Sequence, residues 1–325
     1  MNLSKIKFGI VIPQGWRNDL PRNSSVAQFK YSRDIAIEAE KNGFDSAYAY
    51  DHFIPHYRYP KTGNFFECFT LLSALSTELK RMKIGQIVTC NSYRNPALLA
   101  KMVATLDVIT NGRAELGIGA GWFKEEYIAY GYQYSSDVER IMQLKESIQI
   151  IKKLWTQKIA NFQGKYYSVN DATSFPKPVQ KPHPMVMVGG SGEKYLLKVA
   201  AKYADRYNLY FGSPEEMEKK ISILNNYNSP KRKIEYSIVL PCLIIQEHEQ
   251  LKKIMKKMGK QKMAVEEFKK SIAGGLTVGT IDDVVEGIGQ YINIGVNHFI
   301  FHFLHIDSSI LKEFSKVIKK SKGFF

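Results

Sequence analysis

Short runs of apolar residues alternate with longer amphipathic stretches along most of the chain. Eight of these runs have the length and the β-branched or aromatic content of buried strands. They occupy residues 8–13, 46–52, 83–90, 114–120, 185–190, 206–211, 237–245 and 298–303. Stretches with apolar residues at helical spacing lie between them, among them 26–43, 95–110, 138–155, 193–204 and 281–295. The pattern predicts an α/β protein and favours a closed parallel (β/α)8 TIM barrel, although strand number alone leaves an open sheet possible.

The segment 95–112 carries clear helix boundaries. Asn95 is suited to the N-cap, and Pro96 stands at the first helical position, where a missing N–H costs little. Asn111 or Gly112 can take the left-handed conformation that ends a helix. The sequence therefore predicts one helix here, between the third and fourth strands.

A chain of 325 residues is long for one domain, but barrels of this type reach that length with insertions. We expect a single domain over residues 1–325, with insertions at about 159–184 and 246–280. The first insertion predicts a hairpin followed by a proline-rich extended connector, and the second predicts extra helices. Insertions of this kind shape a ligand-binding mouth or a subunit contact.

Composition narrows the classes of function. The content of 44% hydrophobic and 24% charged residues is typical of a globular protein, and the apolar runs are too short to cross a bilayer. The start of the chain has no signal-peptide pattern, so we expect a cytoplasmic protein. The net charge of +15 is concentrated in lysine runs at 252–262 and 316–322, which are typical of solvated helix faces. No aromatic residues are interleaved with these lysines, which argues against a role in binding nucleic acid. The positive charge instead favours an anionic cofactor or substrate.

Cysteine and histidine spacing gives little support to a metal site. Cys68, Cys90 and Cys242 are scattered, so we expect neither a disulfide framework nor a zinc site. His298 and His302 are four residues apart in a strand and share a face, but no carboxylate pair or cysteine spacing accompanies them. We therefore expect no metal.

The ends of the predicted strands hold the candidate reactive groups, because ligands of α/β barrels bind there. The second strand ends in Asp51 and His52, and a histidine at this edge can exchange protons near neutral pH. A packed histidine bonded to the backbone is the alternative. Glu67, at the start of the next helix, could face the same mouth, but a carboxylate that stabilises the helix N-terminus is slightly favoured.

Glycines mark two further strand ends. Gly189, Gly190, Ser191 and Gly192 join the fifth strand to a helix, an arrangement that suits a phosphate group, although a tight turn is the alternative. The run GIGAG at 117–121 is not a dinucleotide fingerprint, because Trp122 stands where that motif needs glycine or alanine. These glycines instead predict the close approach of a flat ring to the backbone. An aromatic and acidic lip that includes Glu126 follows them.

Taken together, these segments resemble the luciferase-like monooxygenase superfamily, in the branch of coenzyme F420-dependent oxidoreductases. The resemblance covers nearly the whole chain and is carried by FGIVIPQGWR, AYDHF, VTCNSYRNPALLAKMVATLDVITNGRAELGIGAGWFKEEYIAYGY, FQGKYY, VGGSGEKYLLKVAAKYADRYN and VGTIDDVVEGIGQYINIGVNHFIFHF. It implies a TIM barrel that binds a flavin or deazaflavin across its mouth, a homodimer, and a cis peptide near Gln86 and Ile87. By match of motif it implies a cofactor site of Asp51, His52, Gln86, Ile87, Thr89, Gly189, Gly190, Ser191 and Gly192.

The resemblance implies hydride transfer between C5 of coenzyme F420 and a small organic substrate. His52 is the expected proton donor or acceptor, with Glu67 and Glu126 as further catalytic candidates. Trp122 replaces the catalytic glutamate of related sugar-phosphate dehydrogenases, which argues against a sugar-phosphate substrate. The first alternative is a monooxygenase that uses FMN, oxygen and a partner flavin reductase. The second is a cofactor-binding protein without turnover, and a nucleic-acid binder is a distant third.

Overall fold

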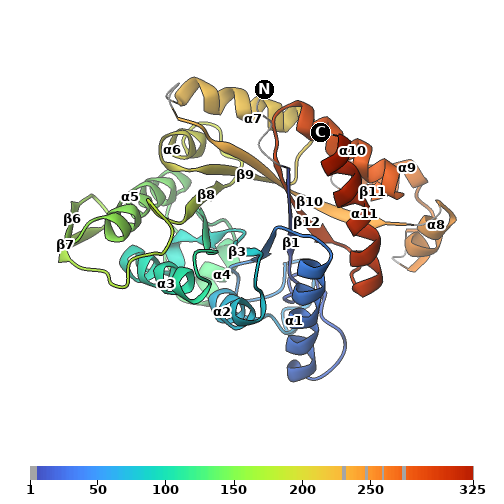
Figure 1. Ribbon diagram of the computed structural model, residues 1–325, viewed down its shortest axis with the longest axis horizontal. Coiled ribbons are helices and arrows are strands. Elements are labelled where there is room, and N and C mark those ends of the chain that lie inside the picture. Colours follow the sequence, from blue (N-terminus) through green and yellow to red (C-terminus); the bar gives the residue numbers. More distant parts are fainter. Residues whose placement is uncertain (1–5, 229–231, 246–247, 258–259, 273–275, 325) are drawn as a thin grey trace.

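The computed structural model describes residues 6–228, 232–245, 248–257, 260–272 and 276–324 of the chain. Figure 1 shows a ring of helices around a parallel sheet that is nearly closed into a barrel. The eight barrel strands are β1 (Lys7–Val11), β2 (Ser46–Ala49), β3 (Lys83–Gln86) with its continuation β4 (Thr89–Cys90), β5 (Glu115–Gly119), β8 (Met185–Gly189), β9 (Arg206–Tyr210), β10 (Glu235–Ile244) and β12 (His298–Phe303). The predicted TIM-barrel fold is confirmed.

The sheet closes where the third strand meets the fourth. β3 pairs with β2, and β4 pairs with β5, so the two short segments are halves of one barrel strand. A parallel bridge joins Ile84 to Ala114, and the backbone N–H of Ile84 donates to the carbonyl of Arg113 at 2.9 Å. The peptide bond between Ile87 and Val88 is cis, in the strand where the resemblance implied one.

The helices cover the outside of the barrel, and apolar side chains fill the space between the two layers. They are α1 (Ser25–Lys41), α2 (Cys68–Glu78), α3 (Pro96–Ile109), α4 (Lys124–Ala129), α5 (Asp137–Thr156), α6 (Leu196–Tyr203), α7 (Pro214–Tyr227), α10 (Ile281–Asn293) and α11 (Ser308–Phe324), with a 3₁₀ turn at Asn91–Tyr93. Asn95 caps α3 by accepting from the N–H of Ala97, and Asn111 and Gly112 both have positive φ, as predicted. No helix in the described residues is long and apolar enough to span a membrane.

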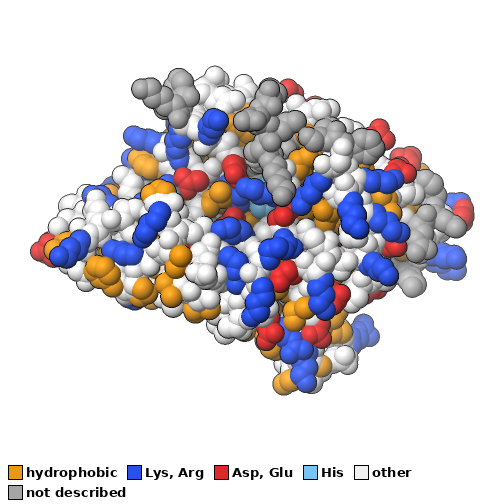
Figure 2. All heavy atoms as spheres, viewed as in Figure 1, with side chains coloured by type: hydrophobic (Ala, Val, Ile, Leu, Met, Phe, Trp, Pro, Cys, Tyr) orange, Lys and Arg blue, Asp and Glu red, His pale blue; other side chains and the backbone are white. Residues whose placement is uncertain are grey.

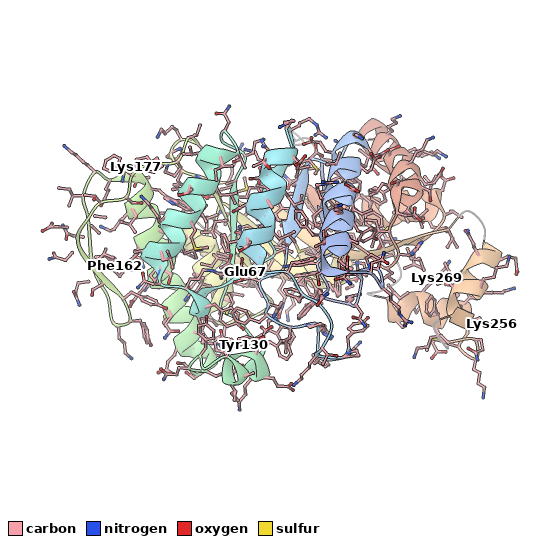
Figure 3. The ribbon with its side chains drawn as sticks, turned by 90° about the horizontal axis from the view of Figure 1, so that it is seen from below. Glu67, Tyr130, Phe162, Lys177, Lys256 and Lys269 are labelled. Atoms are coloured by element: carbon pink, nitrogen blue, oxygen red, sulfur yellow. The ribbon has the colours of Figure 1, made fainter. Side chains whose placement is uncertain are left out.

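Two insertions extend from opposite sides of the barrel. An antiparallel hairpin of β6 (Ala160–Gln163) and β7 (Ser168–Ala172) follows α5. Helices α8 (His248–Lys257) and α9 (Val265–Ser271) and the short β11 (Val278–Gly279) follow β10. Figure 3 shows Phe162 of the hairpin at one end of the molecule and Lys256 of α8 at the other. Basic side chains on the face seen in Figure 2 are interspersed with acidic ones across several elements.

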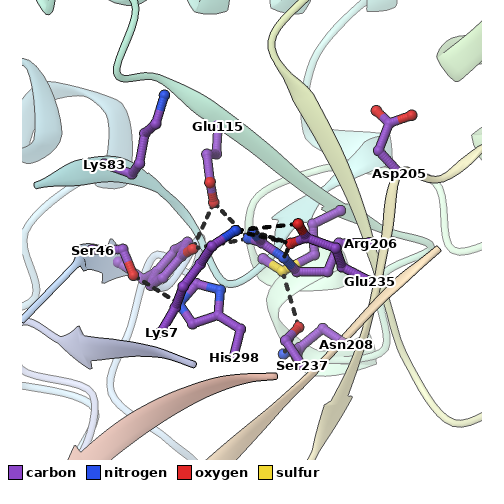
Figure 4. Close-up of polar contacts among 12 residues, drawn as sticks. Lys7, Ser46, Lys83, Glu115, Asp205, Arg206, Asn208, Glu235, Ser237 and His298 are labelled. Atoms are coloured by element: carbon purple, nitrogen blue, oxygen red, sulfur yellow. Dashed lines mark hydrogen bonds and ion pairs between the residues drawn. The ribbon is translucent and has the colours of Figure 1, made fainter. Parts of the chain in front are cut away.

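Charged and polar side chains fill one layer of the barrel interior (Figure 4). The guanidinium of Arg206, which is fully buried, donates to Glu115 Oε2 and to Glu235 Oε2, both at 2.8 Å. Tyr48 donates to the same oxygen of Glu115 at 2.6 Å, and Lys7 Nζ donates to Glu235 at 3.1 Å. Paired charges of this kind are sensitive to the loss of a single partner, because the remaining charge has no water to solvate it.

The two histidines of β12 lie inside the barrel with different partners. Nε2 of His298 lies 2.8 Å from Ser46 Oγ, and Nδ1 of His302 lies 2.6 Å from the hydroxyl of Tyr50. Burial lowers the pKa of both imidazoles well below the usual 6.5, and the nearby cations Arg206 and Lys7 lower that of His298 further. Both rings are therefore neutral in the folded protein at neutral pH.

We expect the free energy of unfolding to decrease as the pH falls below about 6.5. The unfolded chain binds protons at its histidines there and the folded chain does not, so each buried histidine removes up to about 1.4 kcal/mol per pH unit. Urea unfolding at pH 7.5, 6.5 and 5.5 measures the slope. His298→Gln should reduce the slope between pH 6.5 and 5.5, and an unchanged slope would contradict the assignment.

Candidate active site

A cavity of ≈670 Å³ opens at the carboxyl ends of the barrel strands. Its volume is in the range that holds a cofactor-sized ligand. The residues that line it come from strand ends far apart in the sequence and include Trp16, Tyr50, Asp51, His52, Ile87, Val88, Thr89, Cys90, Gly119, Ala120, Gly121, Trp122, Arg140, Gly189, Gly190, Ser191, Gly192, Asn208 and Tyr210. The cavity brings together most of the site residues that the sequence predicted; Gln86, Glu67 and Glu126 are not part of its lining.

His52 is held at the cavity by a carboxylate. Its Nδ1 lies 2.8 Å from Oε2 of Glu126, which is fully buried on α4. No hydrogen bond to Nε2 is found among the residues that the structure describes, and the ring lines the cavity. A carboxylate on Nδ1 fixes the ring orientation and favours the tautomer with its proton on that nitrogen. Nε2 can then accept a proton from a molecule in the cavity.

Glu126 is kept ionised by the donors around it. Burial opposes its ionisation, but the hydrogen bond from His52, the N–H of Phe53 at 2.7 Å and the hydroxyl of Tyr93 at 2.8 Å outweigh burial and lower its pKa. The carboxylate does not line the cavity. This geometry favours Glu126 as a residue that positions His52, and its direct role in catalysis stays a prediction.

Aromatic side chains fix the imidazole of His52 from both sides. Trp16, in the loop after β1, stacks on it with ring centroids 4.0 Å apart and an angle of 14°. Trp122 approaches edge-on at 5.8 Å, and its side chain is half exposed at the mouth. The sequence analysis did not select Trp16. Its position in the first strand–helix loop of a predicted barrel was the available signal.

Asp51 and Glu67 are joined by one arginine. Arg94 forms a two-pronged ion pair with Asp51, at 2.7 and 3.0 Å, and donates to Glu67 at 2.8 Å. Asp51 also accepts from the N–H of Cys90 at 2.9 Å. Glu67 is the N-cap of α2, accepts from the N–H of Thr70 at 2.6 Å, and lies outside the cavity lining. The geometry thus favours the helix-stabilising role for Glu67, and Asp51 ties the ends of two barrel strands together.

Three residues of the third barrel strand were predicted to belong to the cofactor site, and two of them line the cavity. Ile87 and Thr89 line the cavity on either side of the cis peptide, whereas Gln86 is fully buried and does not line it. Cys90 also lines the cavity, with its sulfur 3.0 Å from the hydroxyl of Tyr127. Burial raises the pKa of this thiol to about 12, so it is protonated at neutral pH and unsuited to nucleophilic attack.

The loop 189–192 also lines the cavity, and two side chains from other elements bond to its backbone. The hydroxyl of Tyr207 donates to the carbonyl of Gly190 at 2.7 Å, and Lys220 Nζ donates to that of Ser191 at 2.9 Å. Gly190 has φ of +136°, which strongly favours glycine. The following helix begins at Leu196 rather than directly after the glycines, because residues 193–195 form a turn. The loop therefore lines the cavity together with Leu196, the first residue of α6.

The three glycines of 117–121 all allow close packing within the protein. A side chain at Gly117 would collide with the backbone carbonyl of Gln86, one at Gly119 would lie 2.8 Å from Val88, and one at Gly121 would collide with the hydroxyl of Tyr127. Gly119 and Gly121 also line the cavity. The close approach of a flat ring to them stays a prediction.

Arg140 of α5 is a cationic group that the sequence analysis missed. Its side chain is buried, lines the cavity and stacks against the ring of Tyr134 at 4.1 Å. One Nη donates to Asp137 at 2.6 Å, but Nε has no partner among the described residues. Nε itself is covered by protein atoms, but the guanidinium as a whole is a buried cation in the cavity wall. Together with the glycine loop, this positive charge fits a ligand that carries a phosphate group.

A histidine held by a carboxylate and a glycine loop line the same cavity at the strand ends. These features are typical of barrel enzymes that work with a bound cofactor. The chain matches the family profile of luciferase-like monooxygenases over residues 6–268, and it belongs to this family. Its relatives include oxidoreductases and monooxygenases.

Relatives with both kinds of cofactor are found. The chain is 33% identical over 191 residues to an FMNH₂-dependent dimethylsulfone monooxygenase of Pseudomonas putida, covering 59% of this chain and 51% of the relative. It is 36% identical over 174 residues to an F420-dependent glucose-6-phosphate dehydrogenase of Amycolatopsis mediterranei, covering 53% and 50%. The chain thus spans about half the length of these curated relatives. An F420-dependent secondary alcohol dehydrogenase with an F420–acetone adduct has the same fold, with a TM-score of 0.80, 20% identity and 98% and 99% coverage.

Proposed function

We propose that this protein is a coenzyme F420-dependent oxidoreductase that transfers a hydride between the deazaflavin C5 and an organic substrate. The observation that carries the proposal is the pairing of His52 Nδ1 with the buried Glu126 at 2.8 Å, which leaves Nε2 available at the cavity. Oxidation of an alcohol to a carbonyl removes a hydride from carbon and a proton from oxygen. His52 is placed to accept or return that proton.

Other residues that line the cavity would bind the cofactor or hold His52 in position. Gly189–Gly192 and the guanidinium of Arg140 would bind the phosphate, and Gly119 and Gly121 would lie beside the ring. When bound, the deazaflavin would supply the two-electron hydride chemistry. Trp16 and Glu126 hold the imidazole of His52 in place, and Trp122 at the mouth limits the entry of water.

The FMN-dependent monooxygenase is the second candidate. It is supported by the dimethylsulfone monooxygenase relative. The homodimer, the cytoplasmic location and a partner flavin reductase remain predictions.

We expect purified protein to bind coenzyme F420 and to ignore FMN when titrated separately with each. The phosphate-free deazaflavin precursor should bind at least about tenfold more weakly than F420, because it lacks the charged acceptor for Arg140 and the glycine loop. Tryptophan fluorescence quenching and the absorbance of the cofactor measure both affinities.

The variant Arg140→Met is the matched test of the phosphate contact. It should bring the affinities of F420 and of its precursor closer together while leaving that of the precursor unchanged. Tighter binding of FMN, with oxygen consumption coupled to oxidation of a substrate, would overturn the F420 assignment in favour of the monooxygenase.

A further inference from the structure

A chain of three polar side chains lies at the cavity, apart from His52 and Glu126. The hydroxyl of Tyr50 at the end of β2 is 2.6 Å from Nδ1 of His302 on β12 and 3.3 Å from the hydroxyl of Tyr210 on β9. The rings of Tyr50 and Tyr210 meet edge-on, with centroids 6.1 Å apart. The mechanism above makes no use of these residues, which come from three different strands.

Two members of this group line the cavity, and Tyr210 is the more open of them. Tyr210 is 39% exposed, whereas Tyr50 and His302 are buried. The ring of Trp16 lies between Tyr50 and the imidazole of His52, with ring centroids 5.5 Å and 4.0 Å away. Tyr210 is therefore the member that a ligand in the cavity can reach, apart from His52.

The chain consists of neutral groups. Burial raises the pKa of Tyr50 well above 10 and lowers that of His302 well below 6.5, and the nearby cation Arg17 lowers the latter further. A neutral imidazole can either accept or donate at Nδ1, depending on its tautomer. If Nδ1 accepts from Tyr50, Tyr210 donates to Tyr50 and presents its oxygen as an acceptor. If Nδ1 donates, the chain reverses and Tyr210 donates into the cavity.

We propose that the hydroxyl of Tyr210, oriented by Tyr50 and His302, binds the oxygen of a small alcohol or carbonyl substrate. Both directions of the hydrogen-bond chain suit an alcohol and the carbonyl that forms from it. The alcohol needs an acceptor for its O–H, and the carbonyl needs a donor. Tyr210 contacts the substrate, and Tyr50 and His302 are positioning residues. This inference rests on the proposed function and names its substrate class.

The experiment compares probes of similar shape with and without an oxygen. Cyclohexanol, cyclohexanone and methylcyclohexane are titrated into protein loaded with whichever cofactor it binds, and tryptophan fluorescence reports binding. Wild-type protein should bind the two oxygenated probes about five- to tenfold more tightly than methylcyclohexane. In Tyr210→Phe this preference should fall to within about twofold, because one hydrogen bond contributes up to about tenfold.

Further variants distinguish a loss of orientation of the Tyr210 hydroxyl from a loss of folded protein. Tyr50→Phe and His302→Leu should weaken the preference by a few-fold without changing the affinity for the cofactor. Tyr130→Phe is the matched control, since Tyr130 is half exposed near the mouth and lies outside the cavity lining. An undiminished preference in Tyr210→Phe, or no preference in wild-type protein, overturns the proposal. Because binding is read with either cofactor, preference for FMN in the earlier titration would defeat the proposed function alone.

Discussion

Replacement of His52 by alanine should lower kcat about 10²- to 10⁴-fold with little change in cofactor affinity. This is the range that a positioned general acid or base contributes. Glu126→Gln should cause a smaller loss, because the amide keeps a hydrogen bond to Nδ1 but removes the charge that stabilises a protonated imidazole. Turnover is followed by the absorbance of the cofactor, with a substrate found by screening alcohols and ketones.

Glu67→Gln is the control for this experiment. Glu67 caps α2 and pairs with Arg94 outside the cavity lining, so its replacement should reduce stability by about 0.5–2 kcal/mol and leave kcat nearly unchanged. A large loss of kcat in Glu67→Gln would restore the catalytic role suggested by the sequence. Unchanged turnover and cofactor affinity in His52→Ala would instead favour a protein that binds the cofactor without using this histidine.

Arg206→Met should lower the free energy of unfolding by about 3–5 kcal/mol. The substitution leaves Glu115 and Glu235 without their shared cation inside the barrel, and an unpaired buried charge has this cost. Urea unfolding followed by circular dichroism measures the change. The double variant Arg206→Met/Glu115→Gln should recover most of the loss, because the uncompensated charge of Glu115 is removed and Glu235 keeps its ion pair with Lys7.

An exposed ion pair provides the comparison for this variant. Arg33 and Asp34 of α1 pair at 2.8 Å but are solvated, so Arg33→Ala should change stability far less than Arg206→Met does. Equal effects of Arg206→Met and Arg33→Ala would show that the interior network contributes no more than a surface pair.

The strands and helices could be predicted because their signals are local. The cap of α3 at Asn95 depends on residues within one turn, and the apolar runs of the barrel strands depend on the periodicity of the backbone. The position of His52 at a strand end followed from the predicted fold, since strand ends of a barrel face its ligand. The sequence also indicated the loop 189–192, although the helix after it begins later than expected.

The partners of the site residues could not be predicted, because they are distant in the sequence. Glu126 is 74 residues from His52, and Arg94 joins Asp51 and Glu67 from 43 and 27 residues away. The three carboxylates look alike in the sequence. Their surroundings make Glu126 a support for the imidazole and the other two parts of an ion-pair cluster.

The sequence by itself determined the barrel, its insertions and the strand ends where the ligand site lies, because backbone periodicity and caps are short-range properties. Only the tertiary structure decided which side chains act together: His52 with Glu126 and Trp16, and Tyr210 with Tyr50 and His302. Such pairs form when barrel closure brings separate strands to one mouth. Hydrogen bonds and burial act over a few ångströms in space, whatever the separation along the chain.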